Sequence, residues 1–219
     1  MNDSKIHKVV KINHSDSGIF ELILERNEIY FEPGDCVAIY SDKKKSRPYS
    51  ISSGINDKFI SFLIRTVKNG EVSEYLSKLK KNHEVRISEP FGWFKPIKCS
   101  KNEKNVFLAT GTGIAPFLSY LKSYPTEPPH ALFYGIRKQE DLFELNTLKK
   151  IKNLYISISQ ENSKFHKGRI TDLLSSIPLS KNNYYYCCGR ESMINDVRLF
   201  LKGKGIKNNK IFNEVFFNG

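Results

Sequence analysis

Short apolar runs separated by turn-forming residues fill the first half of the chain. The runs are rich in β-branched and aromatic residues, and Gly, Asn, Asp or Pro bounds each of them, as is typical of short strands. Strands are predicted at residues 8–12, 19–24, 36–40, 49–52, 59–66 and 84–88. This spacing predicts a small antiparallel β-barrel or sandwich. One helix interrupts the strands, with Ser73 as its N-cap and Tyr75, Leu76 and Leu79 as its apolar face.

The second half of the chain changes to strands that alternate with helices. Strands are predicted at residues 106–109, 131–134, 154–158, 184–187 and 210–216, and helices at 116–124, 141–149, from 170 onward, and 193–202. This alternation predicts an α/β doubly wound parallel sheet. Residues 99–105 have the polar composition of a linker. We therefore expect a β-barrel domain at residues 1–99 and an α/β domain at 100–219.

Composition narrows the classes of protein to be considered. Hydrophobic residues make up 39% of the 219 residues and charged residues 26%, as in globular proteins. The sequence has no apolar run of membrane-spanning length and no apolar leader segment, so we expect no membrane association. The four cysteines, Cys36, Cys99, Cys187 and Cys188, lack zinc-ligand spacing and a paired framework. We expect free thiols in the cytoplasm and no metal site.

The formal net charge of +12 allows two interpretations. A basic protein can have an acidic partner, such as an acidic protein, a phosphorylated ligand or a nucleic acid. Alternatively, the lysines simply form a solvated basic surface. They are scattered along the chain, without a zinc finger, an RNA-binding signature or an arginine-rich arm. Nucleic acid is therefore the less favoured partner.

Three segments carry candidate chemistry. The sequence GTGIAP at residues 111–116 lies at a predicted strand-to-helix turn, where backbone N–H groups can approach a pyrophosphate, although a simple tight turn explains it equally well. The sequence RPYS at 47–50 offers an arginine for a phosphate and a tyrosine for an aromatic ligand, but by itself it also suits an ordinary strand. The sequence CCGRESM at 187–193 ends another strand, where a cysteine contacts either a ligand or the core.

Taken together, in this order and in these settings, the three segments resemble the ferredoxin–NADP reductase superfamily. Four further segments carry the resemblance: FEPGD at 31–35, GEVS at 70–73, FGWF at 91–94 and EVF at 214–216. The likeness runs from about residue 5 to residue 217. It implies an N-terminal FAD-binding barrel and a C-terminal NAD(P)-binding domain.

On the flavin side, the resemblance implies that Arg47 binds the FAD pyrophosphate, Tyr49 lies against the isoalloxazine ring and Ser50 sits near flavin N5. The implied FAD-binding residues are Arg47, Pro48, Tyr49, Ser50, Ile64, Arg65, Thr66, Val67, Glu71, Val72 and Ser73. FMN occurs in a branch that carries an attached iron–sulfur domain. The chain lacks the plant-type cysteine spacing of such a domain, so FAD is the expected cofactor.

On the dinucleotide side, the resemblance places Cys188 beside the nicotinamide, Glu214 near the flavin edge and Phe216, followed by Phe217, where an aromatic shields the flavin. The implied dinucleotide-binding residues are Thr110, Gly111, Thr112, Gly113, Pro116, Arg137, Ser159, Gln160, Lys164, Arg169, Cys188, Gly189, Met193 and Phe216. The implied catalytic residues are Ser50, Cys188 and Glu214.

The choice between NADPH and NADH depends on the groups that meet the ribose 2′ position. Family members that use NADPH often have Ser-Arg where this chain has Ser159-Gln160. Lys164, Lys167 and Arg169 follow closely, and Arg169 matches a second phosphate-contacting position. Glu161 could instead serve the ribose hydroxyls of NADH. We expect NADPH, with NAD possible.

The resemblance implies an FAD-dependent reductase that transfers electrons between NADPH and an acidic ferredoxin or flavodoxin. One alternative is the NADH-dependent ferredoxin reductase component of an oxygenase system. Another is a regulatory or assembly subunit that keeps the fold without turnover.

Overall fold

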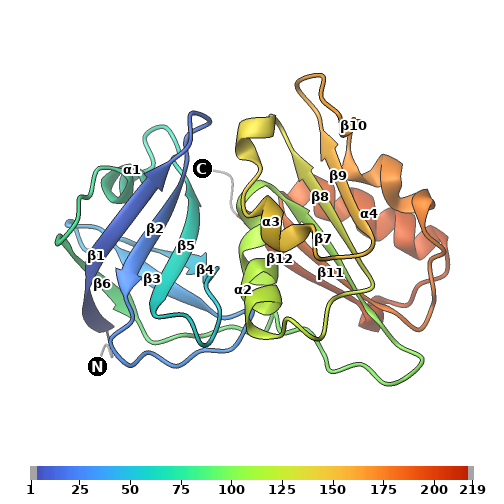
Figure 1. Ribbon diagram of the computed structural model, residues 1–219, viewed down its shortest axis with the longest axis horizontal. Helices are drawn as coiled ribbons and strands as arrows, with labels where there is room; N and C mark the ends of the chain where they lie inside the picture. Colours follow the sequence, from blue (N-terminus) through green and yellow to red (C-terminus); the bar gives the residue numbers. More distant parts are fainter. Residues whose placement is uncertain (1–3, 217–219) are drawn as a thin grey trace. The chain divides into compact units, whose positions relative to one another are not determined.

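The computed structural model describes residues 4–216, which form two compact units (Figure 1). The first unit contains residues 4–95 together with 115–124, and the second contains 96–114 and 125–216. Among the described residues, no helix combines the length and the apolar character needed to cross a membrane.

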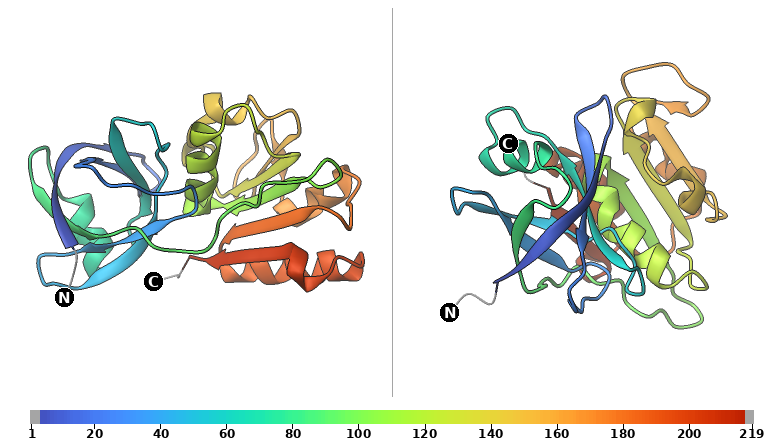
Figure 2. Two further views of the ribbon diagram at one scale, coloured as in Figure 1. Left: turned by 90° about the horizontal axis from the view of Figure 1, so that it is seen from below. Right: turned by 60° about the vertical axis from the view of Figure 1, so that its left-hand side comes forward.

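The first unit is a nearly closed antiparallel barrel of six strands, as predicted. The strands are β1 (Ser4–His14), β2 (Ile19–Glu25), β3 (Cys36–Tyr40), β4 (Ser46–Ser50), β5 (Phe59–Arg65) and β6 (Glu84–Ser88). Their order is β4-β3-β6-β1-β2-β5, and Figure 2 shows the sheet curving on itself. An isolated antiparallel bridge between Ile51 and Phe62 connects the chain after β4 to β5. This bridge brings the two edge strands together and almost closes the barrel.

The barrel core follows from the two-residue period of its strands. In β2, Phe20, Leu22 and Leu24 are fully buried at alternate positions, and Leu22 pairs with Phe62 of β5. Alternate residues of a strand point to one face, so these side chains fill the interior of the barrel.

The β4 strand begins earlier than the sequence predicts. It pairs with β3 from Ser46 opposite Tyr40 to Ser50 opposite Cys36, whereas the prediction began at residue 49. The hairpin register includes Arg47 and Pro48 in the strand. A proline is compatible with this position because β4 is an edge strand.

The prediction of Ser73 as a helix N-cap is wrong. Helix α1 spans Glu71–Ser77, and Gly70 is its N-cap residue. The Ser73 hydroxyl lies in the first turn, where it accepts a hydrogen bond from Val67 N–H at 3.0 Å and donates to Gly70 O at 3.4 Å. A Cβ at residue 70 would come within 2.8 Å of the Ser73 hydroxyl, so a tight glycine turn starts the helix.

The second unit is the predicted parallel sheet. Its strands are β7 (Asn105–Thr110), β8 (Ala131–Ile136), β9 (Leu154–Ile158), β10 (His166–Lys167), β11 (Tyr184–Gly189) and β12 (Ile211–Val215), in the order β10-β9-β8-β7-β11-β12 (Figure 1). The chain starts at β7, extends the sheet through β8 to β10, and then continues on the other side of β7 with β11 and β12. This reversal places a topological switch point between the carboxyl ends of β7 and β11, where such sheets bind ligands.

Two predicted helices are confirmed and two are corrected. Helices α2 (Ala115–Ser123) and α4 (Glu191–Gly203) match the predictions at 116–124 and 193–202. The predicted helix at 141–149 is two short pieces, η2 (Gln139–Asp141) and α3 (Leu145–Leu148), because Glu144 between them adopts a left-handed conformation with φ of 55°. The segment from residue 170 is a 3₁₀ helix, η3 (Ile170–Ser176). Shorter 3₁₀ turns are η1 (Gly111–Ile114) and η4 (Asn208–Lys210).

Candidate functional site

The predicted flavin contacts of the first unit lie along the two edge strands of the barrel. The bridge between Ile51 and Phe62 is antiparallel, and Ser52 N–H donates to Ser61 O at 2.8 Å beside it. The residues before Ile51 therefore run next to the residues after Phe62. This arrangement brings Tyr49 and Ser50 of β4 alongside the segment 63–65 of β5. Sequence reasoning assigned residues 47–50 and 64–67 to the flavin, and the fold brings parts of both segments to the same edge of the barrel.

Tyr49 offers a half-buried aromatic surface at this edge. Its ring packs against the barrel core. Burial raises the pKa of Tyr49 to about 12, although the neighbouring Arg47 opposes the shift. The phenol is therefore neutral at physiological pH, and it can both stack on a flat ligand and form a hydrogen bond. Ser50, the next residue, is buried at 4% exposure.

Positive charges gather at the start of α1. Lys45 Nζ lies 2.7 Å from Glu71 Oε2, and Lys43 Nζ lies 4.0 Å from Glu71 Oε1. The hydrogen bond from Lys45 and the charges of Lys45, Lys43 and Arg47 lower the pKa of Glu71. Three cations thus surround one carboxylate, which leaves a net positive charge that suits a diphosphate. Sequence reasoning missed Lys43 and Lys45, although the run of three lysines just before Arg47 was a visible signal.

The other predicted FAD-binding residues divide into exposed and buried groups. Pro48 is exposed on β4, whereas Val72 and Ser73 are buried in α1. The Arg65 guanidinium donates to Ser17 O at 3.1 Å, and the N–H of Thr66 bonds to Gly18 O at 2.8 Å. The end of β5 is therefore anchored to the turn between β1 and β2.

In the second unit, the predicted glycine loop and cysteine turn meet at the switch point. A Cβ on Gly113 would lie 2.4 Å from Cys188 O, and a Cβ on Gly189 would lie 2.3 Å from Thr110 Oγ1. The N–H of Arg190 donates to Thr110 Oγ1 at 3.1 Å. Only glycine permits this close approach, because a methyl group has no room at either position. The fold therefore brings together two motifs that lie about 75 residues apart in the sequence.

The glycine loop has the features of a pyrophosphate-binding turn. Gly111 adopts a left-handed conformation with φ of 54°, and a Cβ there would meet no atom within 4 Å. Thr112 is half-exposed, and Pro116 lies buried in the first turn of α2, where its missing N–H costs no helical hydrogen bond. The loop thus has an open face at the carboxyl end of β7, which is the geometry that admits a diphosphate.

Cys188 and Glu214 form a hydrogen-bonded pair across adjacent strands. They are opposite one another in the register of β11 and β12, and the Cys188 thiol donates to Glu214 Oε2 at 3.7 Å. Burial and the adjacent Glu214 carboxylate raise the pKa of Cys188 well above its ordinary value. Cys188 is therefore a neutral thiol and not a thiolate nucleophile.

The end of the described chain lies against the cysteine turn. The N–H of Phe216 donates to Gly189 O at 2.9 Å, and the Phe216 side chain is half-buried. Met193 is buried in the first turns of α4 and contributes to the core beneath β11. Phe217 lies outside the described residues.

The predicted ribose-binding residues lie at the carboxyl ends of β8 and β9. The N–H of Ser159 donates to Ile136 O at 3.1 Å, and the N–H of Gln160 donates to Arg137 O at 2.9 Å. Lys164 and Arg169 are exposed on the segment that follows. Glu161, the candidate for the ribose hydroxyls of NADH, accepts a hydrogen bond from Gln139 N–H. One of its carboxylate oxygens is therefore already engaged by the protein backbone.

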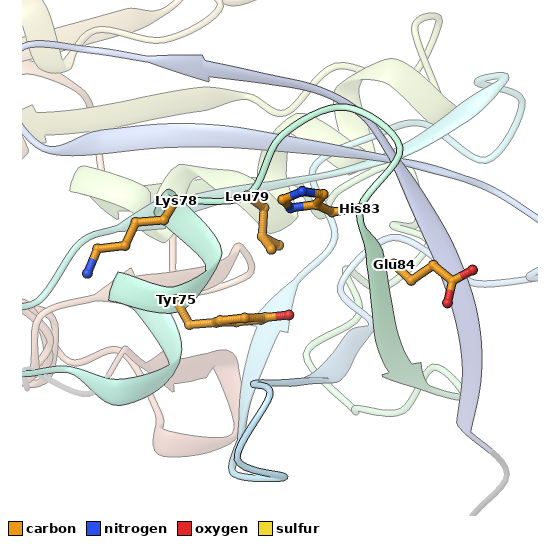
Figure 3. Close-up of a pocket in the computed structure, with 5 residues that line it drawn as sticks. All are labelled: Tyr75, Lys78, Leu79, His83 and Glu84. Carbon is orange, nitrogen blue, oxygen red and sulfur yellow. The ribbon is translucent and has the colours of Figure 1, made fainter.

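A cavity of about 440 Å³ lies elsewhere on the first unit (Figure 3). Its lining residues come from α1, the segment after it and the start of β6, and they are Tyr75, Lys78, Leu79, His83 and Glu84. The charged ends of Lys78 and Glu84 point to opposite sides, so the polar groups do not converge on a ligand (Figure 3). None of the predicted site residues lines this cavity. Within residues 4–216, there is also no group of three or more His, Cys, Asp or Glu side chains that could hold a metal ion.

Comparison with known families assigns both units. Residues 3–95 match the oxidoreductase FAD-binding domain, and residues 107–199 match the oxidoreductase NAD-binding domain. The chain belongs to the ferredoxin–NADP reductase superfamily. The predicted pairing of an FAD-binding barrel with a nicotinamide dinucleotide domain is confirmed by these matches.

Curated relatives of two kinds are similar to this superfamily member. The chain is 28% identical over 203 residues to the ferredoxin–NAD(P)⁺ reductase component of the naphthalene 1,2-dioxygenase system of Pseudomonas putida, and 30% identical over 205 residues to the toluate 1,2-dioxygenase electron transfer component of the same species. These matches cover 86% and 87% of the chain but only 61% and 60% of the relatives. The chain is 25% identical to the ferredoxin–NADP reductase of Azotobacter vinelandii, and this match covers 94% of the chain and 92% of the relative.

Solved structures agree on the fold. A ferredoxin NADP⁺ reductase from Neisseria gonorrhoeae, with bound FAD and NADP, aligns with a TM-score of 0.85 at 20% identity and covers 99% of this chain and 100% of its own. The FAD/NAD-binding domain of a nitric oxide dioxygenase from Vibrio cholerae aligns with a TM-score of 0.86 at 18% identity. This alignment covers 98% of this chain and 99% of the dioxygenase domain. The superfamily member therefore has the same fold as these two structures.

Proposed function

We propose that the protein is an FAD-dependent reductase that transfers electrons between NADPH and a one-electron carrier, a ferredoxin or flavodoxin. The main support for the proposal is that the glycine loop and the cysteine turn lie in contact at the switch point, where the Cys188 thiol donates a hydrogen bond to Glu214. The near-complete match in length to the Azotobacter vinelandii ferredoxin–NADP reductase supports the same activity. A cytoplasmic location belongs to the proposal, because the four thiols suit a reducing compartment.

The first unit would hold FAD at the edge of the barrel. Lys43, Lys45 and Arg47 would bind its pyrophosphate, and the neutral Tyr49 ring would stack on the isoalloxazine. When bound, the flavin supplies the chemistry, because it exchanges a hydride with nicotinamide and single electrons with a carrier.

The second unit would bind and orient the dinucleotide. The N–H groups of the loop 111–113 would bind the pyrophosphate at the open face of that turn. Cys188, as a neutral thiol, would pack beside the nicotinamide, and Glu214 would hold this thiol and accept or release a proton. Ser50, on the first unit, would orient the isoalloxazine ring of the flavin through its hydroxyl group.

NADPH is the preferred donor in this proposal. Arg169 follows β10, which pairs with β9 through His166 opposite Ser157 and Lys167 opposite Ile158. Arg169 thus follows the end of this pairing by two residues, as Gln160 does on β9, and Gln160 occupies the position where NADPH-using relatives often have an arginine. A guanidinium there would bind a 2′-phosphate.

A second candidate is the reductase component of an oxygenase system with NADH as the donor. The 28% and 30% identities to the naphthalene and toluate dioxygenase components support it. The chain spans only about 60% of those relatives, so the comparison concerns a part of them.

Anaerobic titration of the purified protein tests the proposal. We expect a yellow protein whose flavin absorbance is bleached by NADPH at lower concentrations than by NADH, and which then reduces a ferredoxin or a flavodoxin. An NADH preference would favour the oxygenase component. A chain that binds no flavin, or binds it without bleaching, would favour a regulatory or assembly subunit.

A further inference from the structure

An ion pair in the second unit joins Arg169 to Asp196. Arg169 NH1 lies 3.3 Å from Asp196 Oδ2, and Asp196 lies on α4, 27 residues further along the chain. Both side chains are largely accessible, with exposures of 76% and 46%. No sequence motif pointed to Asp196.

Hydrogen bonds hold the backbone around Arg169, whereas its side chain is exposed and contacts Asp196. Asp172 Oδ2 accepts a hydrogen bond from Arg169 N–H at 2.8 Å and lies 3.5 Å from His166 Nε2. The N–H of Gly168 donates to Ile158 O at 3.1 Å, which ties the turn to the end of β9. The backbone of Gly168 is therefore held at the end of β9, just before Ser159 and Gln160, and Asp196 is the counter-ion of the neighbouring Arg169 guanidinium.

The rest of this inference depends on the proposed use of NADPH. A carboxylate that contacts the guanidinium neutralises much of the charge that would attract a 2′-phosphate. The benefit that Asp196 brings by orienting Arg169 is smaller, because exposed ion pairs contribute little. The competition of Asp196 with the phosphate for Arg169 therefore outweighs the benefit of orienting the guanidinium.

We propose that Asp196 is a specificity-determining residue, which competes for Arg169 and so weakens discrimination between nucleotides with and without a 2′-phosphate. Asp196 lies on α4, the helix that follows the cysteine turn. The protein is accordingly tuned toward moderate, and not strict, selectivity for NADPH.

Binding of adenine nucleotides to the intact protein, measured by isothermal titration calorimetry, tests the proposal without any turnover. The probes are 2′-phospho-AMP and 5′-AMP. Asp196→Asn should bind 2′-phospho-AMP about threefold more tightly than wild type and 5′-AMP equally well. Arg169→Gln should weaken 2′-phospho-AMP about tenfold, as expected for loss of a charged hydrogen bond. In the double variant the affinity should equal that of Arg169→Gln.

Glu127→Gln is the matched control, because it makes the same change of charge on an exposed loop of the same unit. It should bind both probes like wild type. Unchanged or weaker binding of 2′-phospho-AMP by Asp196→Asn would overturn the proposal, as would an Asp196→Asn effect that survives in the double variant. Failure of the proposed reductase function would appear separately, as a wild-type protein that holds no FAD or does not oxidise NADPH.

Discussion

Burial determines the ionisation of the candidate site residues one by one. Tyr49 and Cys188 both keep their protons because desolvation disfavours the charged form of each side chain. The positive charge of Arg47 opposes this effect at Tyr49, whereas the carboxylate of Glu214 reinforces it at Cys188. Both groups therefore act through shape and hydrogen bonding. Ser50, buried beside Tyr49, presents an uncharged hydroxyl in the same setting.

Replacement of Ser50 tests its orienting role. We expect Ser50→Val to retain FAD but to slow reduction of the flavin by NADPH about a hundredfold, because a small loss of alignment at the reacting atoms is costly. Stopped-flow absorbance measures this rate. Ser50→Thr, which keeps the hydroxyl group, should remain close to wild type. A Ser50→Val protein that reduces its flavin at the normal rate would exclude this role.

The buried thiol of Cys187 should make the free energy of unfolding depend on pH. Burial raises the pKa of Cys187 to about 12, whereas an unfolded thiol titrates near 9. The raised pKa stabilises the fold below pH 9, and this stabilisation is lost as the pH rises from about 9 toward 12. Between pH 8 and pH 10, the contribution of this thiol to the free energy of unfolding should fall by about 1.4 kcal/mol.

Urea unfolding of the wild type and Cys187→Ala at pH 8 and pH 10 measures this contribution. The loss of stability on going to pH 10 should be smaller in the variant by about that amount. Equal losses in the two proteins would show that the thiol does not titrate with unfolding.

At the scale of elements, the site of the second unit depends on two strand ends that lie side by side. β7 and β11 are neighbours, so Thr110 and Gly189 meet although 79 positions separate them. Gly189 has φ of 135° and no room for a methyl group. The turn after β11 therefore keeps its path only with glycine.

Gly189→Ala should disrupt this junction. We expect it to lower the thermal stability of the protein and to weaken NADPH binding at least tenfold, because the new methyl group would displace Thr110 or the turn. FAD content should be unchanged. Gly203→Ala is the matched control. Gly203 lies at the end of α4, and a Cβ added there would meet no atom within 4 Å. The substitution should therefore be neutral, or it should raise the free energy of unfolding by up to about 1 kcal/mol. Equal nucleotide affinity in Gly189→Ala and wild type would contradict the steric argument.

At the scale of the whole molecule, the net charge of +12 predicts how fast partners associate. Complementary charge raises association rates, and salt screens this attraction. We expect the second-order rate of electron transfer to an acidic ferredoxin to fall at least fivefold between about 20 mM and 200 mM salt. Reduction of the flavin by saturating NADPH is the control and should change little. A rate to ferredoxin that does not respond to salt would mean that the basic surface has no part in recognition.

The sequence by itself determined the two domain types. The change from short apolar runs bounded by turn residues to alternating strands and helices predicted the barrel and the parallel sheet, because such local signals mark strands and helices along the chain. The glycine loop at 111–113 and the cysteine turn at 188–189 were also visible as motifs. Local signals failed at Ser73, where a glycine turn replaced the expected cap, and at Glu144, whose left-handed backbone divides the predicted helix.

Tertiary structure alone decided which distant residues meet. It brought Lys45 to Glu71, Gly113 to Cys188 and Arg169 to Asp196. Such contacts leave no periodic trace in the sequence, because each partner sits in a turn or on an exposed helix face where many residues are compatible with the local backbone. Strand order and register bring them together, and both are set by packing over the whole sheet.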